Sequence, residues 1–343
     1  MPAAVEASEP STPRRWVQTV TLAPPTLKDN TADADRLAAV LKGLCGTPSL
    51  EIGLALLQAI PDRLRQWHYR ARCLLFQDGP GGQLVALTAP DDSAPLAGLA
   101  VDLGTTRVVL RLVDLETGRT LGESAFDNPQ IAVGPDILVR IQHAESDGGR
   151  ETLRALIVDG LNAHLSDLSR ACGLTAEDVY LAAVAGNTAM THLFMGLPAR
   201  WIIREPYTPA VNRPGVLSAA ALGLLVNPAA RVLVFPNIGS YFGGDLIAGI
   251  LFAGLHRREA AAILVDVGMP SSVGAIISSR LLSPGSRPTL FIRTIGRRAA
   301  PSARTIPPEV RPTRGAESRP DSTPTQVPSR TMSTAWAGTP SSS

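Results

Sequence analysis

Two apolar segments joined by a short polar turn constrain the fold of this chain more than any other feature. Residues 96–101 and 108–113 are apolar, and the turn between them reads Asp102, Leu103, Gly104, Thr105 and Thr106. This pattern predicts a β-hairpin whose tip exposes backbone N–H groups, which together bind phosphate oxygens. The glycine lets a ligand approach the backbone, and the threonines add hydroxyl donors. The aspartate is placed to hold a water molecule of a hydrated Mg²⁺ ion.

A similar unit occurs late in the chain, where an apolar strand at residues 263–267 contains Asp266 and is followed by Gly268. Two strand–Asp–x–Gly units in one chain suggest two phosphate loops that face each other across one nucleotide. Short motifs also match by chance, so a polar hairpin tip without a ligand is the competing interpretation of each unit.

Glycines and small polar residues follow two further predicted strands. Gly186, Asn187 and Thr188 come after residues 179–184, and Gly243, Gly244 and Asp245 begin an apolar helix. Backbone N–H groups at such strand-to-helix transitions favour anions. A plain N-cap is the alternative for the Asn–Thr pair, and close packing at a helix start is the alternative for the two glycines.

Composition and charge exclude several classes of protein. Hydrophobic residues make up 45% of the 343 residues, which supports a sizeable core, and the net charge of +2 indicates no nucleic-acid partner. No apolar stretch has membrane-spanning length and residues 1–15 lack a secretory signal, so we expect a cytoplasmic protein without a membrane partner. The cysteines are Cys45, Cys73 and Cys172. Their wide spacing predicts free thiols and no iron–sulfur cluster in this chain.

The pattern along the chain divides it into four parts. Residues 1–15 are expected to be disordered. A small α+β module is expected at 16–95, with strands at 16–22, 69–76 and 84–88 and helices at 31–41 and 49–60, the second ending near Pro61. Residues 96–268 predict an α/β lobe with a mixed sheet, with strands at 98–103, 106–114, 119–125, 179–184, 231–235 and 263–267 and a long helix at 149–172.

The last 75 residues differ in composition from the rest. Residues 269–343 hold ten arginines, three acidic residues, eleven prolines and no lysine. Such a segment buries too little apolar surface to offset its ordering entropy, so it is expected to be a disordered basic tail in which only residues 286–296 could be regular.

The order of these motifs resembles the actin-like ATPase superfamily, whose lobes have a ribonuclease-H-like fold. Two stretches narrow the resemblance: residues 127–131 with Gly134, Asp136 and Arg140, and residues 185–196. They resemble the reductive activators of corrinoid-dependent proteins, an ASKHA-domain, ferredoxin-like family. Residues 22–37 resemble that family's middle region.

The resemblance implies that ATP and Mg²⁺ are bound between two lobes. Nucleotide use would be coupled to reduction of a Co(II) corrinoid to Co(I) on a corrinoid protein or methyltransferase, with electrons from an external donor. It implies catalytic roles for Asp102, Asp245 and Asp266, with a Mg²⁺-bound water on Asp102. The nucleotide-binding residues would be Gly104, Thr105, Thr106, Gly186, Asn187, Thr188, Gly243, Gly244 and Gly268.

This sequence departs from the family pattern in two ways. Members of the family carry an N-terminal [2Fe-2S] domain with a cysteine cluster, whereas this sequence has no such cluster. The phosphate loop that begins at Gly268 continues with Met-Pro-Ser-Ser at 269–272, where the family has Thr-Asn-Gly/Ala-Glu. We therefore expect an inactive or partial fragment.

Two alternatives remain open at this point. One is a small-molecule kinase of the same superfamily, for which Asp245 is the candidate catalytic aspartate. The other is a noncatalytic module that binds a corrinoid protein through residues 16–95.

We predict that residues 269–343 are the product of a frameshift. Met-Pro-Ser-Ser can be encoded ATG-CCG-AGT-TCG, and one preceding A read one base out of register gives Asn-Ala-Glu-Phe, which restores the family motif. The nucleotide sequence after codon 268 checks this. An alternative frame there should encode an apolar, glycine-rich lobe, and its absence would show the hypothesis to be wrong.

Overall fold

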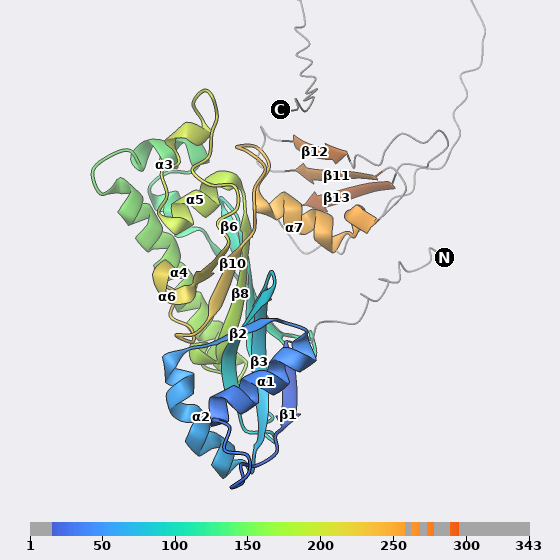
Figure 1. The fold of residues 1–343 in the computed structure, drawn as a ribbon. Helices are drawn as coiled ribbons and strands as arrows, with labels where there is room; N and C mark the ends of the chain where they lie inside the picture. The colour runs from blue at the N-terminus through green and yellow to red at the C-terminus, as the bar shows by residue number, and fades with distance from the viewer. Residues whose placement is uncertain (1–15, 258–261, 268–272, 278–288, 295–343) are drawn as a thin grey trace, which may run out of the picture. The chain divides into compact units, whose positions relative to one another are not determined.

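The computed structural model describes residues 16–257, 262–267, 273–277 and 289–294 (Figure 1). The first part is the α+β module expected from the sequence, built on a four-stranded sheet of order β1-β3-β4-β2. Its elements are β1 (Val17–Thr21), α1 (Asp33–Cys45), β2 (Ser49–Ile52), α2 (Leu54–Gln66), β3 (Arg70–Asp78) and β4 (Gly81–Thr88).

Helices α1 and α2 pack their apolar faces against this sheet. Leu37 and Leu41 of α1, and Ile60 and Leu64 of α2, are fully buried in one cluster. Each pair is four residues apart, so both members lie on the same helix face. Helix α1 ends at Gly46, whose φ of 62° lies in the left-handed region that glycine adopts without strain.

The sequence prediction of one helix from residue 49 to residue 60 is wrong at both ends. Ser49–Ile52 form a strand paired in parallel with β4, and α2 runs past Pro61 to Gln66. Proline removes a helical hydrogen bond and costs about 3 kcal/mol inside a helix. Burial of Ile60 and Leu64 on either side of it offsets that cost, so tertiary packing overrides the local signal.

The second part is the expected mixed-sheet lobe. Its six-stranded sheet has the order β7-β6-β5-β8-β10-β9. Strands β5 to β7 form an antiparallel meander, β8 and β10 run parallel to β5, and β9 closes the edge in the antiparallel direction. This mixed α/β lobe, with the strand order of a ribonuclease-H-like fold, confirms the predicted fold class. The strands are β5 (Ala97–Leu103), β6 (Arg107–Asp114), β7 (Thr120–Asp127), β8 (Val179–Gly186), β9 (Val216–Ser218) and β10 (Arg231–Val234).

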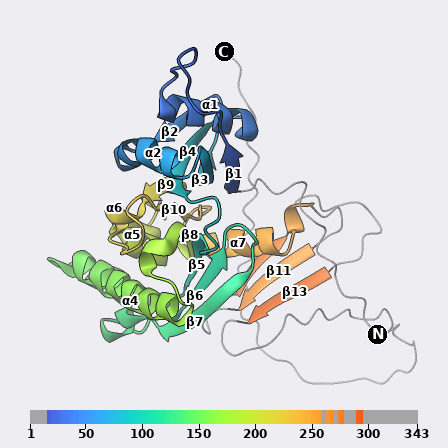
Figure 2. The same ribbon diagram turned by 90° about the horizontal axis from the view of Figure 1, so that it is seen from below.

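A long helix covers one face of this sheet, as Figure 2 shows for α4 beside β6 and β7. Its buried residues include Ile157, Leu161 and Leu165, which join the strand residues in one core. The helices of the lobe are α3 (Ile137–His143), α4 (Gly149–Ala171), α5 (Thr188–Met195), α6 (Ala219–Leu222) and α7 (Gly244–Phe252), with short 3₁₀ turns at Pro129–Ala132, Ala176–Asp178, Arg200–Ile202 and Leu255–Arg257. No helix among the described residues is long and apolar enough to cross a membrane.

A three-stranded sheet follows, with β11 (Ala262–Val267) between β12 (Val273–Ile277) and β13 (Thr289–Thr294). Strand β11 is antiparallel to β12 and parallel to β13. The expectation that residues 263–267 form the last strand is therefore wrong. Strand β13 lies within residues 286–296, the part of the basic tail expected to be able to be regular, whereas β12 is a short β-branched run in a segment of unfavourable average composition. The remaining residues of the expected disordered segments, 1–15, 269–272, 278–288 and 295–343, lie outside the described residues.

The N-terminal module is joined to the lobe by apolar packing and by one buried cation. Val17, Leu74 and Val85 form a cluster with Leu96 and Leu181. Arg72, only 5% exposed, donates hydrogen bonds of 2.6 and 3.1 Å to one oxygen of Glu116 and one of 2.9 Å to the carbonyl of Ala94. A guanidinium bound to both a carboxylate and a carbonyl fixes the connection between the two parts.

Replacing Arg72 with methionine is expected to lower the free energy of unfolding by about 1–3 kcal/mol, because several hydrogen bonds are lost at a buried position. Arg111 pairs with Glu123 at a site where both side chains are half exposed, so the matched change Arg111→Met should have little effect. Urea unfolding of both variants measures the difference. Equal losses would show that the Arg72 contacts add nothing beyond a surface ion pair.

Candidate functional site

Three loops meet at one edge of the six-stranded sheet. Strands β5, β8 and β10 are parallel neighbours, so the segments after their carboxyl ends lie side by side. The register pairs Leu103 with Gly186 and Val184 with Val234. The first loop is Gly104–Thr106, the second is Gly186–Thr188, and the third leads from β10 to α7. The sequence motifs on these three segments are thus brought together by topology.

The first loop is a tight turn held by a neighbouring asparagine. A Cβ atom on Gly104 would come within 2.3 Å of the Arg107 carbonyl oxygen, so only glycine fits at this position. Asn128 donates from Nδ2 to the Gly104 carbonyl at 2.9 Å, and its backbone N–H donates to the Thr106 carbonyl at 2.8 Å. The turn is therefore fixed from its carbonyl side.

Asn187 connects the second loop to the first. Its Oδ1 accepts a 2.9 Å hydrogen bond from Met190 N at the start of α5, and its Nδ2 donates to the Thr105 hydroxyl at 3.0 Å. The N-cap interpretation of Asn187 is therefore correct, and the same carboxamide also contacts the first loop, while its part in a nucleotide site stays a prediction. Thr188 has a different role, since it is 1% exposed and donates its hydroxyl to the Gly239 carbonyl at 3.0 Å.

The third loop packs against the second through glycines. A Cβ on Gly243 would lie 2.4 Å from Asn187 Cα and 2.7 Å from the Gly186 carbonyl oxygen. A Cβ on Gly244 would lie 2.6 Å from Phe235 Cβ. Close packing therefore requires both glycines, and it brings the start of α7 onto the start of α5.

Two of the three predicted catalytic aspartates lie on elements that border the three loops, and the third lies in a different sheet. Asp102 is half-buried near the end of β5, and Asp245 is half-buried in the first turn of α7, where its Oδ1 accepts a 2.8 Å hydrogen bond from Leu246 N. Asp266 lies in β11, opposite Gly274 and Arg293. Its side-chain environment and Gly268 lie outside the described residues, so the facing of two phosphate loops stays a prediction.

A buried polar group behind the first loop had no role in the sequence prediction. Asn128, Gln130 and Arg140 are each at most 1% exposed. Burial lowers the pKa of the Arg140 guanidinium, against the opposing effect of nearby Asp136. The segments containing these residues were noticed only as a resemblance, because nothing local in the sequence indicates that polar side chains are buried there.

His192 is a second buried group that the sequence did not indicate. It is fully buried, with Nδ1 2.7 Å from the Thr188 carbonyl oxygen and Nε2 accepting from Ala210 N at 3.1 Å. These partners assign the proton to Nδ1, and burial lowers the pKa of the imidazole. The histidine therefore attaches the segment around residue 210 to α5.

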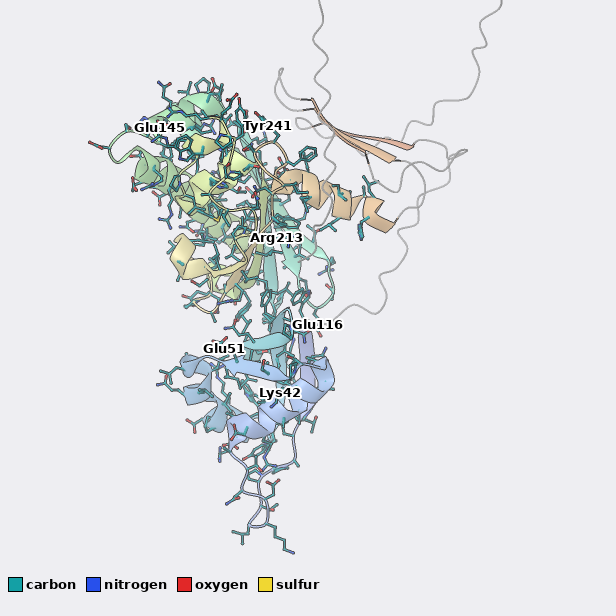
Figure 3. The ribbon with its side chains drawn as sticks, turned by 45° about the horizontal axis from the view of Figure 1, so that its top comes forward. Lys42, Glu51, Glu116, Glu145, Arg213 and Tyr241 are labelled. Atoms are coloured by element: carbon teal, nitrogen blue, oxygen red, sulfur yellow. The ribbon has the colours of Figure 1, made fainter. Side chains whose placement is uncertain are left out.

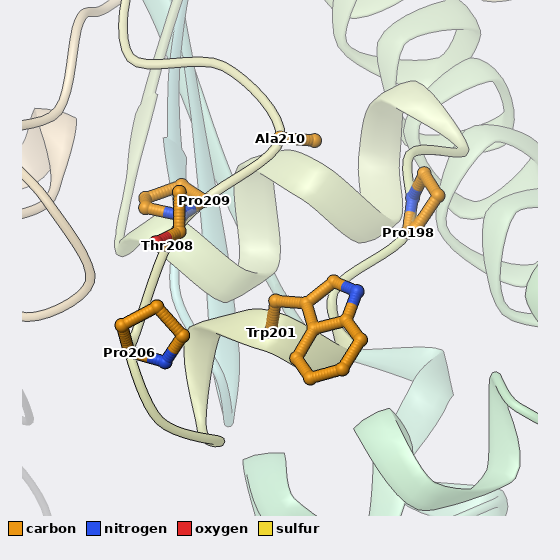
Figure 4. A pocket seen from close by; sticks show the side chains of 6 residues that line it. All are labelled: Pro198, Trp201, Pro206, Thr208, Pro209 and Ala210. Carbon is orange, nitrogen blue, oxygen red and sulfur yellow. The ribbon is translucent and has the colours of Figure 1, made fainter.

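That segment borders a hollow of about 480 Å³, shown in Figure 4. Its lining consists of Pro198, Trp201, Pro206, Thr208, Pro209 and Ala210. The neighbouring Tyr207 ring lies 6.0 Å from the ring of Tyr241, which Figure 3 labels. Tyr207 also accepts a 2.6 Å hydrogen bond at its carbonyl from the Ser240 hydroxyl. The hollow is thus connected to the third loop, although it contains none of the predicted site residues.

Among the described residues, no three histidine, cysteine, aspartate or glutamate side chains come together as a metal-binding group. Cys45, Cys73 and Cys172 are free thiols. Burial, with a smaller contribution from Cys45, raises the pKa of the Cys73 thiol to about 12, so this thiol stays protonated at neutral pH.

The fold and the three loops define the class, a mixed α/β lobe of ribonuclease-H-like topology preceded by a small α+β module. Residues 97–258 match the family model of the RACo middle region, and residues 8–94 match that of the RACo linker region. The N-terminal module thus corresponds to the linker region, and the expectation that it resembles the middle region is wrong. The chain belongs to the family of RACo-type corrinoid reductive activators.

Two relatives show the same similarity. The corrinoid activation enzyme RamQ of Eubacterium limosum is 30% identical over 177 residues, which cover 51% of this chain and 29% of RamQ. Among solved structures, a reductive activator for corrinoid, iron–sulfur protein matches with a TM-score of 0.69 and 32% identity over 78% of this chain. That match covers 42% of the solved chain. This chain therefore spans less than half the length of either relative.

Gly243→Ala is expected to lower the free energy of unfolding by about 1–3 kcal/mol, because the new methyl group meets backbone atoms of the second loop. Gly43 is exposed in α1, and a Cβ atom there would have no neighbouring atom within 4 Å, so Gly43→Ala should be neutral or stabilising by up to about 1 kcal/mol. Urea unfolding compares the two variants. A neutral Gly243→Ala would mean that α7 is not packed on the second loop.

Proposed function

We propose that this chain acts in the ATP-dependent reductive activation of corrinoid proteins, in which Co(II) is reduced to Co(I) by electrons from an external donor. The names of both relatives, a corrinoid activation enzyme and a reductive activator for corrinoid, iron–sulfur protein, support the substrate class. The partner would be a corrinoid protein or its methyltransferase. The lobe would supply one side of the nucleotide site.

The observation that carries this proposal is the junction of the three loops. Asn187 donates to Thr105 across 82 positions of sequence, and Gly243 packs on Asn187. Loops joined in this way hold their backbone N–H groups in fixed directions before any ligand arrives, which lowers the cost of ordering on binding.

The residues present fit a nucleotide phosphate. Thr105 accepts a hydrogen bond from Asn187, so its own hydroxyl proton remains available to a phosphate oxygen. Gly104 allows close approach of the backbone, and the first turns of α5 and α7 add N–H groups and a favourable dipole. Asp102 would hold Mg²⁺ through a water molecule, and the metal would neutralise phosphate charge. Asp245 would lie beside the same phosphates, and Asp266 and Gly268 would contribute the opposing loop.

ATP with Mg²⁺ is expected to bind the full chain weakly, with a dissociation constant near 1 mM, or about 4 kcal/mol of binding free energy. The described residues 96–257 form one lobe, which supplies only part of the contacts, and no turnover is expected from that lobe because a closed, water-free site needs two lobes. A titration followed by amide NMR should shift Thr105, Asn187 and the start of α7. Micromolar affinity, or shifts elsewhere only, would contradict the proposal.

A matched pair of variants sharpens this titration. Thr105→Val removes the hydroxyl that faces Asn187 and should weaken ATP binding roughly fivefold, the equivalent of about 1 kcal/mol. Thr120→Val makes the same chemical change at an exposed position of β7 and should leave binding unchanged.

A further inference from the structure

A buried asparagine forms hydrogen bonds to two carbonyl groups of the first loop. Asn128 is 1% exposed and lies between β7 and the 3₁₀ turn Pro129–Ala132. Its Nδ2 holds the carbonyl of Gly104 at 2.9 Å, and its backbone N–H holds that of Thr106 at 2.8 Å. Two carbonyl groups of a three-residue loop thus point toward one residue.

The direction of the carbonyls fixes the direction of the N–H groups. In a trans peptide the C=O of one residue and the N–H of the next point in opposite directions. Because the Gly104 carbonyl points toward Asn128, the Thr105 N–H points away from it. Within the ranges that the structure describes, no protein group accepts a hydrogen bond from the Thr105 N–H. That donor thus points away from Asn128, and the proposed phosphate would accept a hydrogen bond from it.

Asn128 is itself held by the backbone N–H of Gln130, whose side chain is buried and fixed by further hydrogen bonds. Its Oδ1 accepts a 3.0 Å hydrogen bond from Gln130 N, and Gln130 donates from Nε2 to the Leu153 carbonyl of α4 at 2.8 Å. Arg140 donates to Gln130 Oε1 at 3.4 Å and to the Gly134 carbonyl at 2.8 Å. The amide that orients the loop is therefore anchored to α3 and α4.

The same group of residues reaches the other side of the loop. Arg140 Nη1 lies 3.6 Å from the sulfur of Met190, and Met190 N donates to Asn187, which donates to Thr105. A continuous series of contacts therefore runs from Gly104 through Asn128, Gln130, Arg140, Met190 and Asn187 back to Thr105. Both the carbonyl side and the hydroxyl side of the loop are held by it.

The charge in this series of contacts is unusual. Arg140 is fully buried, its Nη2 has no hydrogen-bond partner, and no described carboxylate forms an ion pair with it. Asp136 lies near enough to act on this charge without forming an ion pair with it, and a buried cation that lacks a direct ion pair is costly and only weakly screened. Positive charge behind a loop favours an anion in front of it.

We propose that Asn128, Gln130 and Arg140 are positioning residues for the first phosphate loop. Asn128 turns the Gly104–Thr105 peptide so that its N–H faces the phosphate, and Gln130 and Arg140 keep Asn128 in that orientation. This inference rests on the proposed nucleotide-binding function.

Two substitutions and one matched control test the proposal in the full chain. Asn128→Ala removes the carboxamide. Asn128→Asp keeps its size and the acceptor for Gln130 N but presents no donor to the Gly104 carbonyl at neutral pH. Asn162→Ala is the control, because Asn162 also bridges a carbonyl and an N–H, those of Gly223 and Leu225, away from the first loop.

Backbone ¹⁵N relaxation of Thr105 is the first readout. The unsubstituted chain should give an order parameter near the rigid value of about 0.85, and both Asn128 variants should fall below about 0.6. The control should leave Thr105 rigid even where its loss of global stability matches that of Asn128→Ala. The proposal would be overturned if the order parameter of Thr105 stayed at the rigid value in Asn128→Asp, or if it fell by the same amount in the Asn162→Ala control. If Asn128→Ala does not fold, Asn128→Asp decides.

Titration with ATP and Mg²⁺ is the second readout and separates the two proposals. A roughly tenfold weaker affinity in Asn128→Asp than in the unsubstituted chain is expected, and equal affinities would overturn the positioning role. If the unsubstituted chain binds no ATP, the proposed function fails, while the relaxation of Thr105 still decides whether Asn128 positions the loop.

Discussion

The candidate site depends on one carboxamide, that of Asn187. Its oxygen caps α5, its nitrogen donates to Thr105, and its Cα lies against Gly243. The two hydrogen bonds also fix the orientation of the carboxamide. Met190 N is a donor, so the oxygen of Asn187 must face it, and the nitrogen of Asn187 is then left to donate to the Thr105 hydroxyl. Three segments that are distant in sequence are thereby held at a single point. The site is consequently built on the ends of sheet strands and helices, where position is set by the core beneath them.

The glycines at this point follow from the same geometry. Gly186 lies so close to the first loop that a Cβ would come within 2.7 Å of the Leu103 carbonyl oxygen, and Gly243 meets Asn187 at a similar separation. Side chains would force these backbones apart, and the N–H groups of neighbouring loops could then no longer converge on one small anion. Glycine makes the unfolded chain more flexible, so these positions lower stability in exchange for close approach of the loops.

Local patterns predicted most of the fold and the backbone part of the site. The hairpin around Gly104, the long helix α4 and the glycine-rich turns all have signals within a few residues of the feature they produce. Strand β2 and the continuation of α2 through Pro61 were missed because pairing with β4 and burial of Ile60 and Leu64 decide them. Strand β12 was missed because the composition of a long segment was averaged, whereas β13 lies within residues 286–296, the one part of that segment expected to be able to form regular structure.

The buried polar residues could not have been predicted in this way. Asn128 has its partner Gly104 24 positions away, and Arg140 contacts Met190 across 50 positions. A polar side chain is stable in a core only when its partners are in place, so the reason for its burial exists in the folded molecule and in no local pattern. His192 follows the same rule, since its acceptor nitrogen is satisfied by the backbone of residues 210 and 211.

The surface of α7 explains why this lobe is expected to bind a nucleotide only weakly by itself. The helix begins at the site with Gly244 and Asp245, yet near its end Leu251 is 50% and Phe252 is 89% exposed. The third loop likewise exposes Ile238 and Tyr241 to 66% and 75%. A nucleotide bound at the proposed site would remain in contact with water on its other side, so each phosphate hydrogen bond would compete with solvent and be worth little. Strong binding would require a second surface that covers these apolar groups and excludes that water, and the energy of covering them would then be coupled to the presence of the nucleotide.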